Sequence, residues 1–254
     1  MDKKNDKYFN KHNIYFDNID NLSNYINNKK VLIITDDNIP ESYYSSLLNN
    51  EYFYLFVIHN GETSKSLETY ASIIVKLNEL SFSRHDLIIS IGGGVVGDLA
   101  GFVASTYKRG IDWINVPTTT LAMIDSCYGG KTAINIDNIK NNVGTFYNPR
   151  LVLIDTALLS SLPTRHFNNG IVEALKMGYL FDEKLIDMIE KNYKENIEEI
   201  IRYALFYKIK VVKKDPHERQ YRKILNFGHT FGHAFESAKL ISSQLLHGEA
   251  VGLG

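Results

Sequence analysis

Three histidines near the end of the sequence could hold a metal ion. His229 and His233 are four residues apart in the string NFGHTFGH, and His247 follows in HGEA. In a helix this spacing places two imidazoles on one face, and a third imidazole nearby would supply most of a catalytic zinc shell with one position open for substrate. Such a pair is also common on exposed helix faces and at helix caps. The spacing by itself leaves both interpretations open.

Polar residues continue this pattern towards the amino terminus. Arg222, Asn226, His229 and His233 follow one another at steps of four, three and four, so one helix over 222–233 would carry all four on one face. The apolar residues that flank them are Ile224, Leu225 and Phe227. A solvated helix face would normally carry Glu and Lys at such positions. We therefore expect these four side chains to belong to a site.

A glycine-rich turn could hold a phosphate. The string GGGVVGD at 92–98 follows the apolar run 86–91 and precedes a helical pattern of apolar residues. Bare glycine backbone at the start of a helix lets a pyrophosphate approach the first N–H groups and the positive end of the helix dipole. The string is not a strict GxGxxG, and a tight turn is the alternative. Asp98 has two possible roles. Its negative charge could stabilise the helix by interacting with the positive end of the helix dipole, or its carboxylate could contact a ligand at the carboxyl end of the sheet, where open α/β folds bind ligands.

Several lysines lie where an anion could meet them. Lys131 follows two glycines and Lys140 precedes two asparagines in stretches without periodicity. Loop lysines are usually solvated, but the glycines indicate close backbone approach to an anion. Glu173 and Lys176 are one helical turn apart in a small, apolar stretch, which is less typical of the alternative, a surface ion pair. Lys208 continues the apolar stripe of a predicted helix and needs an anionic partner there.

The elements that must position these residues alternate between strand and helix. Short apolar runs separated by helical patterns predict a parallel α/β sheet. The predicted strands are 31–35, 53–58, 86–91, 113–116 and 151–155. Beyond Pro163 the pattern becomes helical. We expect an α/β domain over 1–157 and an α-helical domain over 158–254, and the end of the chain at Gly254 within an expected helix indicates a truncated sequence.

Composition narrows the classes of partner. The 254 residues carry 28 basic and 29 acidic side chains, so no overall field attracts nucleic acid or an anionic membrane. The single cysteine, Cys127, excludes an internal disulfide and fits a reducing compartment. The amino-terminal stretch lacks the apolar region of a signal peptide, and no apolar run is long enough to span a bilayer. We expect a cytoplasmic protein.

Six segments resemble 3-dehydroquinate synthase, a family of the sugar phosphate cyclase superfamily, and they occur in the family's order. They are GGGVVGDLAGFVAS, RGIDWINVPTTTLAMIDSCYGGKTAIN, IKNNVGTFYNP, NGIVEALKMG, KILNFGHTFGHAFE and LHGEAVGLG. The resemblance implies a Rossmann-like NAD-binding α/β domain, followed by an α-helical metal- and substrate-binding domain that is incomplete at its C-terminus.

The same resemblance implies a lyase of the shikimate pathway. Members of the family convert 3-deoxy-D-arabino-heptulosonate 7-phosphate to 3-dehydroquinate and phosphate, using NAD and a divalent metal, zinc or cobalt. NAD takes up a hydride and returns it, phosphate is eliminated between these two steps, and an intramolecular aldol closure follows. NAD is therefore regenerated in each turnover.

A role for each matching residue also follows from the resemblance. The metal ligands would be Glu173, His229 and His247, so that His233 becomes a substrate or proton-relay partner. The residues expected to hold NAD are Asp36, Asn38, Glu62, Lys65, Gly93, Gly94, Val95, Asp98, Thr118, Thr119, Asp125, Lys131 and Lys140. The residues expected to bind substrate or take part in catalysis are Asp125, Lys131, Lys140, Asn141, Lys176, Lys208, Glu218, Arg222 and Asn226. Arg109 matches an arginine that is lent to the neighbouring subunit's site, which implies a homodimer.

The sequence departs from the family pattern in two places. Ile139 stands before Lys140 where the family usually has glycine, and Cys127-Tyr128 replaces a small, aliphatic pair. Both changes can alter loop geometry without removing a charged group. Relatives also carry further C-terminal helices, so we expect a chain that ends at Gly254 to be poorly active or unstable.

Three alternatives stay open. The first is a related cyclase of the 2-deoxy-scyllo-inosose synthase type, although Arg222 and Asn226 ahead of Gly228-His229 favour dehydroquinate synthase. The second is a metal-dependent polyol dehydrogenase, which would release NADH. The third is a catalytically silent fragment or regulatory subunit that binds a partner cyclase.

Overall fold

The computed structural model describes residues 6–27, 29–137, 139–237 and 245–254. Contacts between residues divide it into two compact units. The sheet unit comprises the described residues of 6–118 and 130–158, and the helical unit comprises those of 119–129 and 159–254. Each unit carries its own group of predicted site residues.

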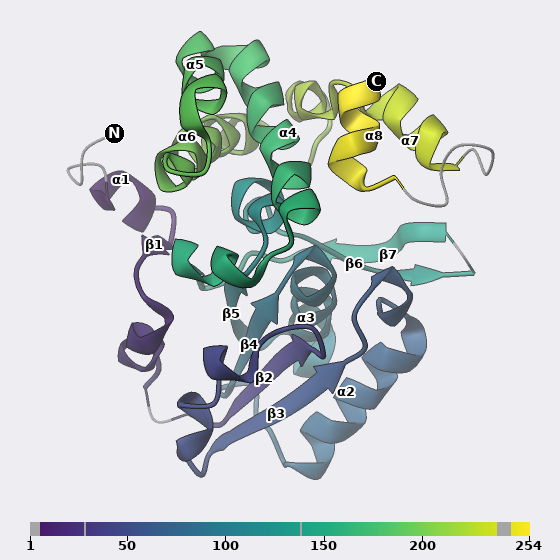
Figure 1. Cartoon of the computed structure of the whole chain (residues 1–254). Helices are drawn as coiled ribbons and strands as arrows, with labels where there is room; N and C mark the ends of the chain where they lie inside the picture. Colours follow the sequence, from purple (N-terminus) through teal and green to yellow (C-terminus); the bar gives the residue numbers. More distant parts are fainter. Residues whose placement is uncertain (1–5, 28, 138, 238–244) are drawn as a thin grey trace. The chain divides into compact units, whose positions relative to one another are not determined.

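A six-stranded parallel sheet forms the centre of the sheet unit (Figure 1). Its strands are, in spatial order, β1 (Ile14–Phe16), β8 (Leu151–Ile154), β5 (Asp112–Pro117), β4 (Leu87–Gly92), β2 (Val31–Asp36) and β3 (Phe53–Ile58). The five strands predicted from apolar runs are confirmed to within one or two residues at their ends. The sequence analysis missed β1, which pairs with β8 and has only three residues, too few to show a pattern.

Burial explains why these runs form central strands. Every residue of β2 and β4 is buried, as expected for strands covered on both faces. Helix α3 (Gly94–Thr106) packs against β4 and β5, and α2 (Leu67–Glu79) packs against α3 (Figure 1). The resulting core joins apolar residues of the sheet, such as Leu32 and Ile88, to Val103 of α3.

An antiparallel hairpin of β6 (Lys131–Ile136) and β7 (Ile139–Phe146) packs on α3. The sequence analysis treated Lys131 and Lys140 as loop residues, and this was wrong because both lie on hairpin strands. Nearly all of β7 is exposed. Its Asn and Lys residues therefore hide the apolar alternation by which a strand is normally found.

The helical unit contains α4 (Thr164–Phe181), α5 (Glu183–Asn192), α6 (Ile197–Lys214), α7 (His229–Ser237) and α8 (His247–Leu253). A π-helical turn, η7 (Ala122–Ser126), contacts α4 and α6. The stripe predicted for α6 is confirmed, since Ile200, Ile201 and Leu205 are fully buried and Lys208 is nearly so.

Shorter elements of the chain are α1 (Asp6–Asn10), η2 (Ile19–Tyr25), η3 (Glu41–Tyr43), η4 (Leu47–Asn49), η5 (Glu62–Ser64), η6 (Tyr107–Arg109), η8 (Thr156–Ser161) and η9 (Tyr221–Asn226).

The single helix predicted over 222–233 is wrong. Residues Tyr221–Asn226 form the 3-10 turn η9, and α7 begins at His229. Between them Gly228 has a φ of 80°, which a right-handed helix cannot contain. A Cβ at this position would also lie 2.8 Å from the Val251 carbonyl oxygen. The chain turns here because α8 approaches the backbone closely.

In the described ranges no helix combines the length and the apolar character needed to cross a membrane.

Candidate active site

Three potential ligand atoms come together where three helices of the helical unit meet. Glu173 lies on α4 and is fully buried, while His229 and His247 are the first residues of α7 and α8. The Oε1 atom of Glu173 lies 3.9 Å from Nε2 of His229 and 3.7 Å from Nε2 of His247. All three ligand atoms lie within 4.8 Å of one another. One carboxylate and two imidazoles with this spacing match a catalytic zinc shell.

The donor chemistry of this cluster fits a divalent cation. Glu173 Oε1 is buried and has no hydrogen-bond partner in the described residues. Nδ1 of His229 lies 3.2 Å from the Phe227 carbonyl oxygen, which can only accept, so this nitrogen carries the proton and the lone pair is on Nε2. Burial and the charge of Lys176 lower the pKa of His229 to about 4. The imidazole is therefore neutral near pH 7 and suited to bind a metal.

Lys176 holds the other oxygen of the Glu173 carboxylate. Its Nζ donates to Glu173 Oε2 and, at 2.6 Å, to the carbonyl oxygen of Leu225 in η9. Both side chains are buried, so the alternative of an ordinary surface ion pair is wrong. Burial raises the pKa of Glu173 and the charge of Asp125 adds to this, while Lys176 acts in the opposite direction. A cation at the cluster would favour the ionised carboxylate.

Lys208 finds its anionic partner in Asp125. The Lys208 ammonium group lies 2.5 Å from Asp125 Oδ1 and also donates to the Asp125 backbone carbonyl oxygen. Burial raises the pKa of Asp125, but the charges of Lys208 and Lys176 outweigh it, so the net pKa lies below the ordinary value. The lysine on the buried face of α6 is therefore compensated by a residue of η7.

Arg222 is oriented by backbone oxygens. Its Nη1 donates to the carbonyl oxygens of Gly129, at 3.1 Å, and Pro216, at 2.7 Å. Both acceptors are neutral and fix the orientation of the buried guanidinium, while the charges of Glu218, Asp125 and Asp215 favour its charged form. Nearby, Asn226 Nδ2 donates to Glu218 Oε1 at 2.9 Å. The predicted substrate residues 218, 222 and 226 thus form one group, although they do not share a helix face.

Asp215 shapes the turn that carries this group, and the sequence analysis missed it. Its carboxylate accepts hydrogen bonds from the backbone N–H groups of Arg219, Gln220 and Arg222 at 2.9, 2.7 and 3.1 Å. These bonds lower its pKa to about 2. The signal in the sequence was the dipeptide Asp215-Pro216, because Asp often caps turns by binding backbone N–H groups.

Three predicted site residues have left-handed backbone. The φ angles are 65° for Arg109, 56° for Asn141 and 54° for Glu218. Non-glycine residues adopt this conformation at a cost, and such strain often occurs at functional sites. Arg109 is also exposed.

The sheet unit gathers a second polar group near the start of α3. Lys65 is buried, and its Nζ lies 2.5 Å from Asp98 Oδ2 and also donates to Asn141 Oδ1 of the hairpin. Glu62 Oε1 accepts from Asn135 Nδ2 at 2.8 Å. Four of the residues predicted for NAD or substrate, at 62, 65, 98 and 141, therefore lie together, and η5 is tied to β6 and β7.

The carboxyl ends of three strands carry further predicted NAD residues. Asp36 ends β2, and its Oδ1 accepts from the Asn38 backbone N–H at 2.9 Å. Gly93 follows β4 and caps α3 without a side-chain hydrogen bond. Thr118 follows β5, and its buried Oγ1 has no hydrogen-bond partner among the residues that the structure describes. A polar ligand at this edge would meet an unsatisfied hydroxyl group and a helix N-terminus, which fits a dinucleotide.

Comparisons with known sequences identify the chain. Two family models match it, described as 3-dehydroquinate synthase N-terminal over 55–169 and 3-dehydroquinate synthase C-terminal over 170–254. The 3-dehydroquinate synthase of Clostridium tetani is 43% identical over 96% of this chain and 70% of its own length. That of Alkaliphilus oremlandii is 42% identical over 94% of this chain and 68% of its own length. The chain belongs to the 3-dehydroquinate synthase family.

Several solved structures share the fold of this chain. The 2-epi-5-epi-valiolone synthase of Streptomyces hygroscopicus, with NAD⁺ and Zn²⁺ bound, is 30% identical with a TM-score of 0.81 over 94% of this chain and 70% of its own. A 2-deoxy-scyllo-inosose synthase complexed with carbaglucose-6-phosphate, NAD⁺ and Co²⁺ is 30% identical, with a TM-score of 0.82. The match covers 94% of this chain and 68% of that synthase. An iron-containing alcohol dehydrogenase of Thermotoga maritima shares the fold alone. It is 16% identical, with a TM-score of 0.65, and the match covers 95% of this chain and 75% of the dehydrogenase.

The remaining predicted site residues lie as follows. Lys131 and Lys140 are exposed on the hairpin. Gly94 and Val95 form the first turn of α3, and Thr119 Oγ1 accepts from the Ala122 backbone N–H at 3.1 Å. The side chain of His233 lies outside the described residues, so its predicted role as a substrate or proton-relay partner stays a prediction.

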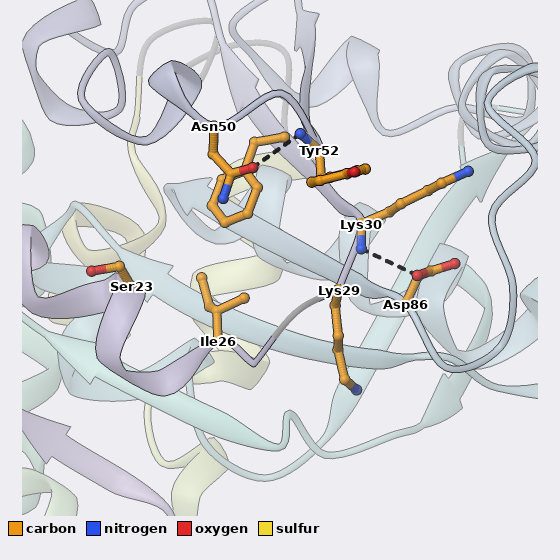
Figure 2. A pocket seen from close by; sticks show the side chains of 8 residues that line it. Ser23, Ile26, Lys29, Lys30, Asn50, Tyr52 and Asp86 are labelled. Atoms are coloured by element: carbon orange, nitrogen blue, oxygen red, sulfur yellow. Dashed lines mark hydrogen bonds between the residues drawn. The ribbon is translucent and has the colours of Figure 1, made fainter.

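A pocket of about 510 Å³ lies elsewhere in the sheet unit (Figure 2). It is lined by Ser23, Ile26, Lys29, Lys30, Asn50, Tyr52, Phe53 and Asp86. Several of these residues directly precede β2, β3 and β4, so the pocket lies at the amino ends of the parallel strands. Open α/β folds bind ligands at the opposite, carboxyl ends. We therefore assign no part of the active site to this pocket.

Proposed function

We propose that this chain catalyses the 3-dehydroquinate synthase reaction, in which 3-deoxy-D-arabino-heptulosonate 7-phosphate is converted to 3-dehydroquinate and phosphate with NAD and a divalent metal. The observation that carries the proposal is the cluster of Glu173, His229 and His247, in which the buried Glu173 Oε1 has no hydrogen-bond partner among the residues that the structure describes. The membership of the family and the cofactors named for the two cyclases support it.

Glu173, His229 and His247 would hold the metal, zinc or cobalt. When bound, the metal supplies a Lewis acid for substrate oxygens, and NAD supplies a reversible hydride acceptor. Lys176 binds the second oxygen of Glu173 and thereby keeps Oε1 directed at the two imidazoles. A lysine in this place fixes the orientation of a ligand, which metal sites generally achieve with a hydrogen bond from the surrounding protein.

The buried cations of the helical unit would bind the phosphate and carboxylate groups of the substrate. The Lys208 ammonium has three donors, and its contacts with Asp125 occupy two of them. The orientation of Arg222 is fixed by hydrogen bonds to two backbone carbonyl oxygens. These groups are fixed before substrate arrives, so they can orient it and stabilise the charge of the departing phosphate with little reorganisation.

The sheet unit would bind NAD at the carboxyl edge of its sheet. The Gly93–Gly94 turn and the start of α3 would meet the pyrophosphate. Thr118 would use its buried hydroxyl group, which has no hydrogen-bond partner in the described part of the chain, and Asp36 would accept from a ribose hydroxyl group. Lys65 and Asp98, which lie near the start of α3, would also contact the cofactor. We retain 1–157 as the NAD-binding domain and 158–254 as the metal- and substrate-binding domain within this proposal.

Further parts of the proposal rest on the family resemblance. Lys131, Lys140 and Asn141 are assigned to the substrate, and His233 to a substrate or proton-relay role. Arg109, which is exposed at a strained turn, would act in the site of a second copy, and the enzyme would be a homodimer. We also infer a cytoplasmic location, because the single cysteine and the substrate class fit it.

Product analysis tests the proposed function. The chain is incubated with Zn²⁺, NAD⁺ and the heptulosonate phosphate, and released phosphate and 3-dehydroquinate are both quantified. We expect equal amounts of the two products, and no products with the Glu173→Gln variant. A chain that binds both metal and NAD⁺ yet releases no phosphate would overturn the proposal, and NADH formed in step with product would indicate a dehydrogenase.

A further inference from the structure

Helix α4 contacts the start of α8 at three levels, one helical turn apart. Arg165, Asn169 and Glu173 follow at steps of four along α4 and so share one face. Arg165 Nε and Nη2 each lie 2.7 Å from a carboxylate oxygen of Glu249. Asn169 Oδ1 accepts from the Gly248 backbone N–H at 2.6 Å. Glu173 Oε1 lies 3.7 Å from His247 Nε2, so the same stripe ends at the metal cluster.

Helix α8 depends on these contacts for its position. It has only seven residues, and helices this short are not stable without tertiary contacts. Its first N–H groups have no partners within the helix. Asn169 satisfies the N–H of Gly248, and Glu249 Oε2 satisfies that of Leu246 at 2.9 Å. Both groups flank His247. Asn169 of α4 holds the backbone on one side of this ligand, and Arg165 of α4 holds the Glu249 carboxylate that caps the other side.

The approach of the two helices leaves no space for a side chain at residue 248. A Cβ there would overlap the Asn169 backbone carbonyl oxygen. Asn169 is itself buried, so its side chain acts in a dry, tightly packed interface where a lost hydrogen bond is costly. The position of the His247 ring relative to Glu173 is therefore set by a few atoms of α4.

We propose that Asn169, assisted by the Arg165–Glu249 pair, is a positioning residue that fixes His247 for metal binding. The inference rests on the proposed function, because it takes Glu173, His229 and His247 as the ligands. Without the Asn169 acceptor, the Gly248 N–H loses its partner and the first turn of α8 moves. His247 then leaves the arrangement in which its Nε2 faces Glu173 Oε1. Residues that orient metal ligands typically change metal affinity by about 10- to 100-fold when removed.

Metal titration with matched variants tests this proposal. The dissociation constants of Zn²⁺ and Co²⁺ are measured against a competing chelator for the unmodified chain, Asn169→Ala and Asn169→Asp, which retains an acceptor oxygen. Asn168→Ala is the control, because this asparagine is exposed on the same helix. We expect Asn169→Ala to weaken binding about 10- to 100-fold, Asn169→Asp to restore most of it, and Asn168→Ala to change it less than about twofold.

A second measurement separates positioning from general stability. The visible absorption bands of bound Co²⁺ report ligand geometry, so Asn169→Ala should change their shape and Asn169→Asp should restore it. A variant that lowers the melting temperature without changing either the metal affinity or the bands would overturn the proposal. If Asn169→Ala does not fold, Arg165→Gln replaces it in the test. We expect this variant to lose about two- to fivefold in metal affinity, a smaller effect because the Arg165–Glu249 pair is more exposed.

The failure of the proposed function gives a different result. If Glu173→Gln binds metal as well as the unmodified chain does, then the ligand assignment itself is wrong. If Glu173→Gln loses the metal and Asn169→Ala retains it with full affinity, the ligands are correct and only the positioning role is rejected.

Discussion

The guanidinium of Arg222 occupies the space that a side chain at residue 129 would need. A Cβ built on Gly129 overlaps Nη2 of Arg222, and Gly129 has a φ of 117°. The same glycine accepts a hydrogen bond from Arg222 through its carbonyl oxygen. Gly129 therefore both makes room for the arginine and holds it.

The Gly129→Ala variant should displace Arg222 and weaken substrate binding. A carbocyclic phosphonate mimic of the substrate should raise the melting temperature of the unmodified chain when NAD⁺ and metal are present. Gly129→Ala and Arg222→Ala should both lose most of that shift, and Gly129→Ala should lower kcat/KM by about 100-fold.

Gly61→Ala controls for backbone strain, because Gly61 has a φ of 110° and open space around it. Both alanine variants should be destabilised by the positive φ. If Gly61→Ala loses the mimic-induced shift as fully as Gly129→Ala does, strain explains the effect. An undiminished shift in Arg222→Ala would mean that the phosphate binds elsewhere.

Alanine at Glu173, His229 or His247 should remove most of the bound metal. Each residue supplies one of three ligand atoms within 4.8 Å, and two remaining ligands seldom hold zinc tightly. Bound zinc is measured by elemental analysis after dialysis, with His233→Ala as the comparison. Loss of metal in His233→Ala together with retention in His247→Ala would show that the helical histidine pair binds the metal.

Removing one partner of the Lys208–Asp125 pair should destabilise the helical unit. Lys208→Met leaves the Asp125 carboxylate without its closest positive charge, at a cost of about 3 kcal/mol in the free energy of unfolding. The double variant Lys208→Met/Asp125→Asn should recover part of that loss, since it leaves no unpaired charge. Urea denaturation measures both values. Equal losses in the single and double variants would show that the unpaired Asp125 carboxylate is not the cause of the destabilisation.

The stabilising effect of Asp215 should disappear in acid. Its pKa is lowered from 3.8 to about 2 by hydrogen bonds from three backbone N–H groups. A carboxyl group with a lowered pKa in the folded state adds stability above its unfolded pKa and loses it as the pH falls towards the folded pKa. The difference in melting temperature between the unmodified chain and Asp215→Asn should therefore shrink between about pH 5 and pH 3. A difference that stays constant over this range would contradict the assignment.

Sequence patterns predicted those strands and helices whose buried apolar residues form a continuous run or repeat at regular intervals. The apolar runs at 31–35 and 53–58 became β2 and β3, and the stripe on α6 placed Lys208 at a buried position. The pattern also showed that Lys208 needs an anionic partner. It could not show that the partner is Asp125, because the contact joins residues 83 positions apart.

The errors occurred where tertiary contacts override local pattern. The helix predicted through 222–233 is interrupted at Gly228 because α8 approaches the backbone there. The β6–β7 hairpin was missed because most residues of β7 are exposed. The contact of Asn169 with Gly248 spans 79 positions, and no local feature of the sequence indicates it. The family resemblance supplied the candidate ligands, and the fold explains how residues from three helices meet.

Turnover at limiting NAD⁺ tests the central claim most directly. The chain is supplied with Zn²⁺, one equivalent of NAD⁺ per chain and an excess of the heptulosonate phosphate, while phosphate release and NADH absorbance are followed together. A synthase that regenerates its cofactor should release many phosphates per NAD⁺ without accumulation of NADH. Phosphate release that stops at one equivalent, or NADH that rises in proportion to product, would contradict the account.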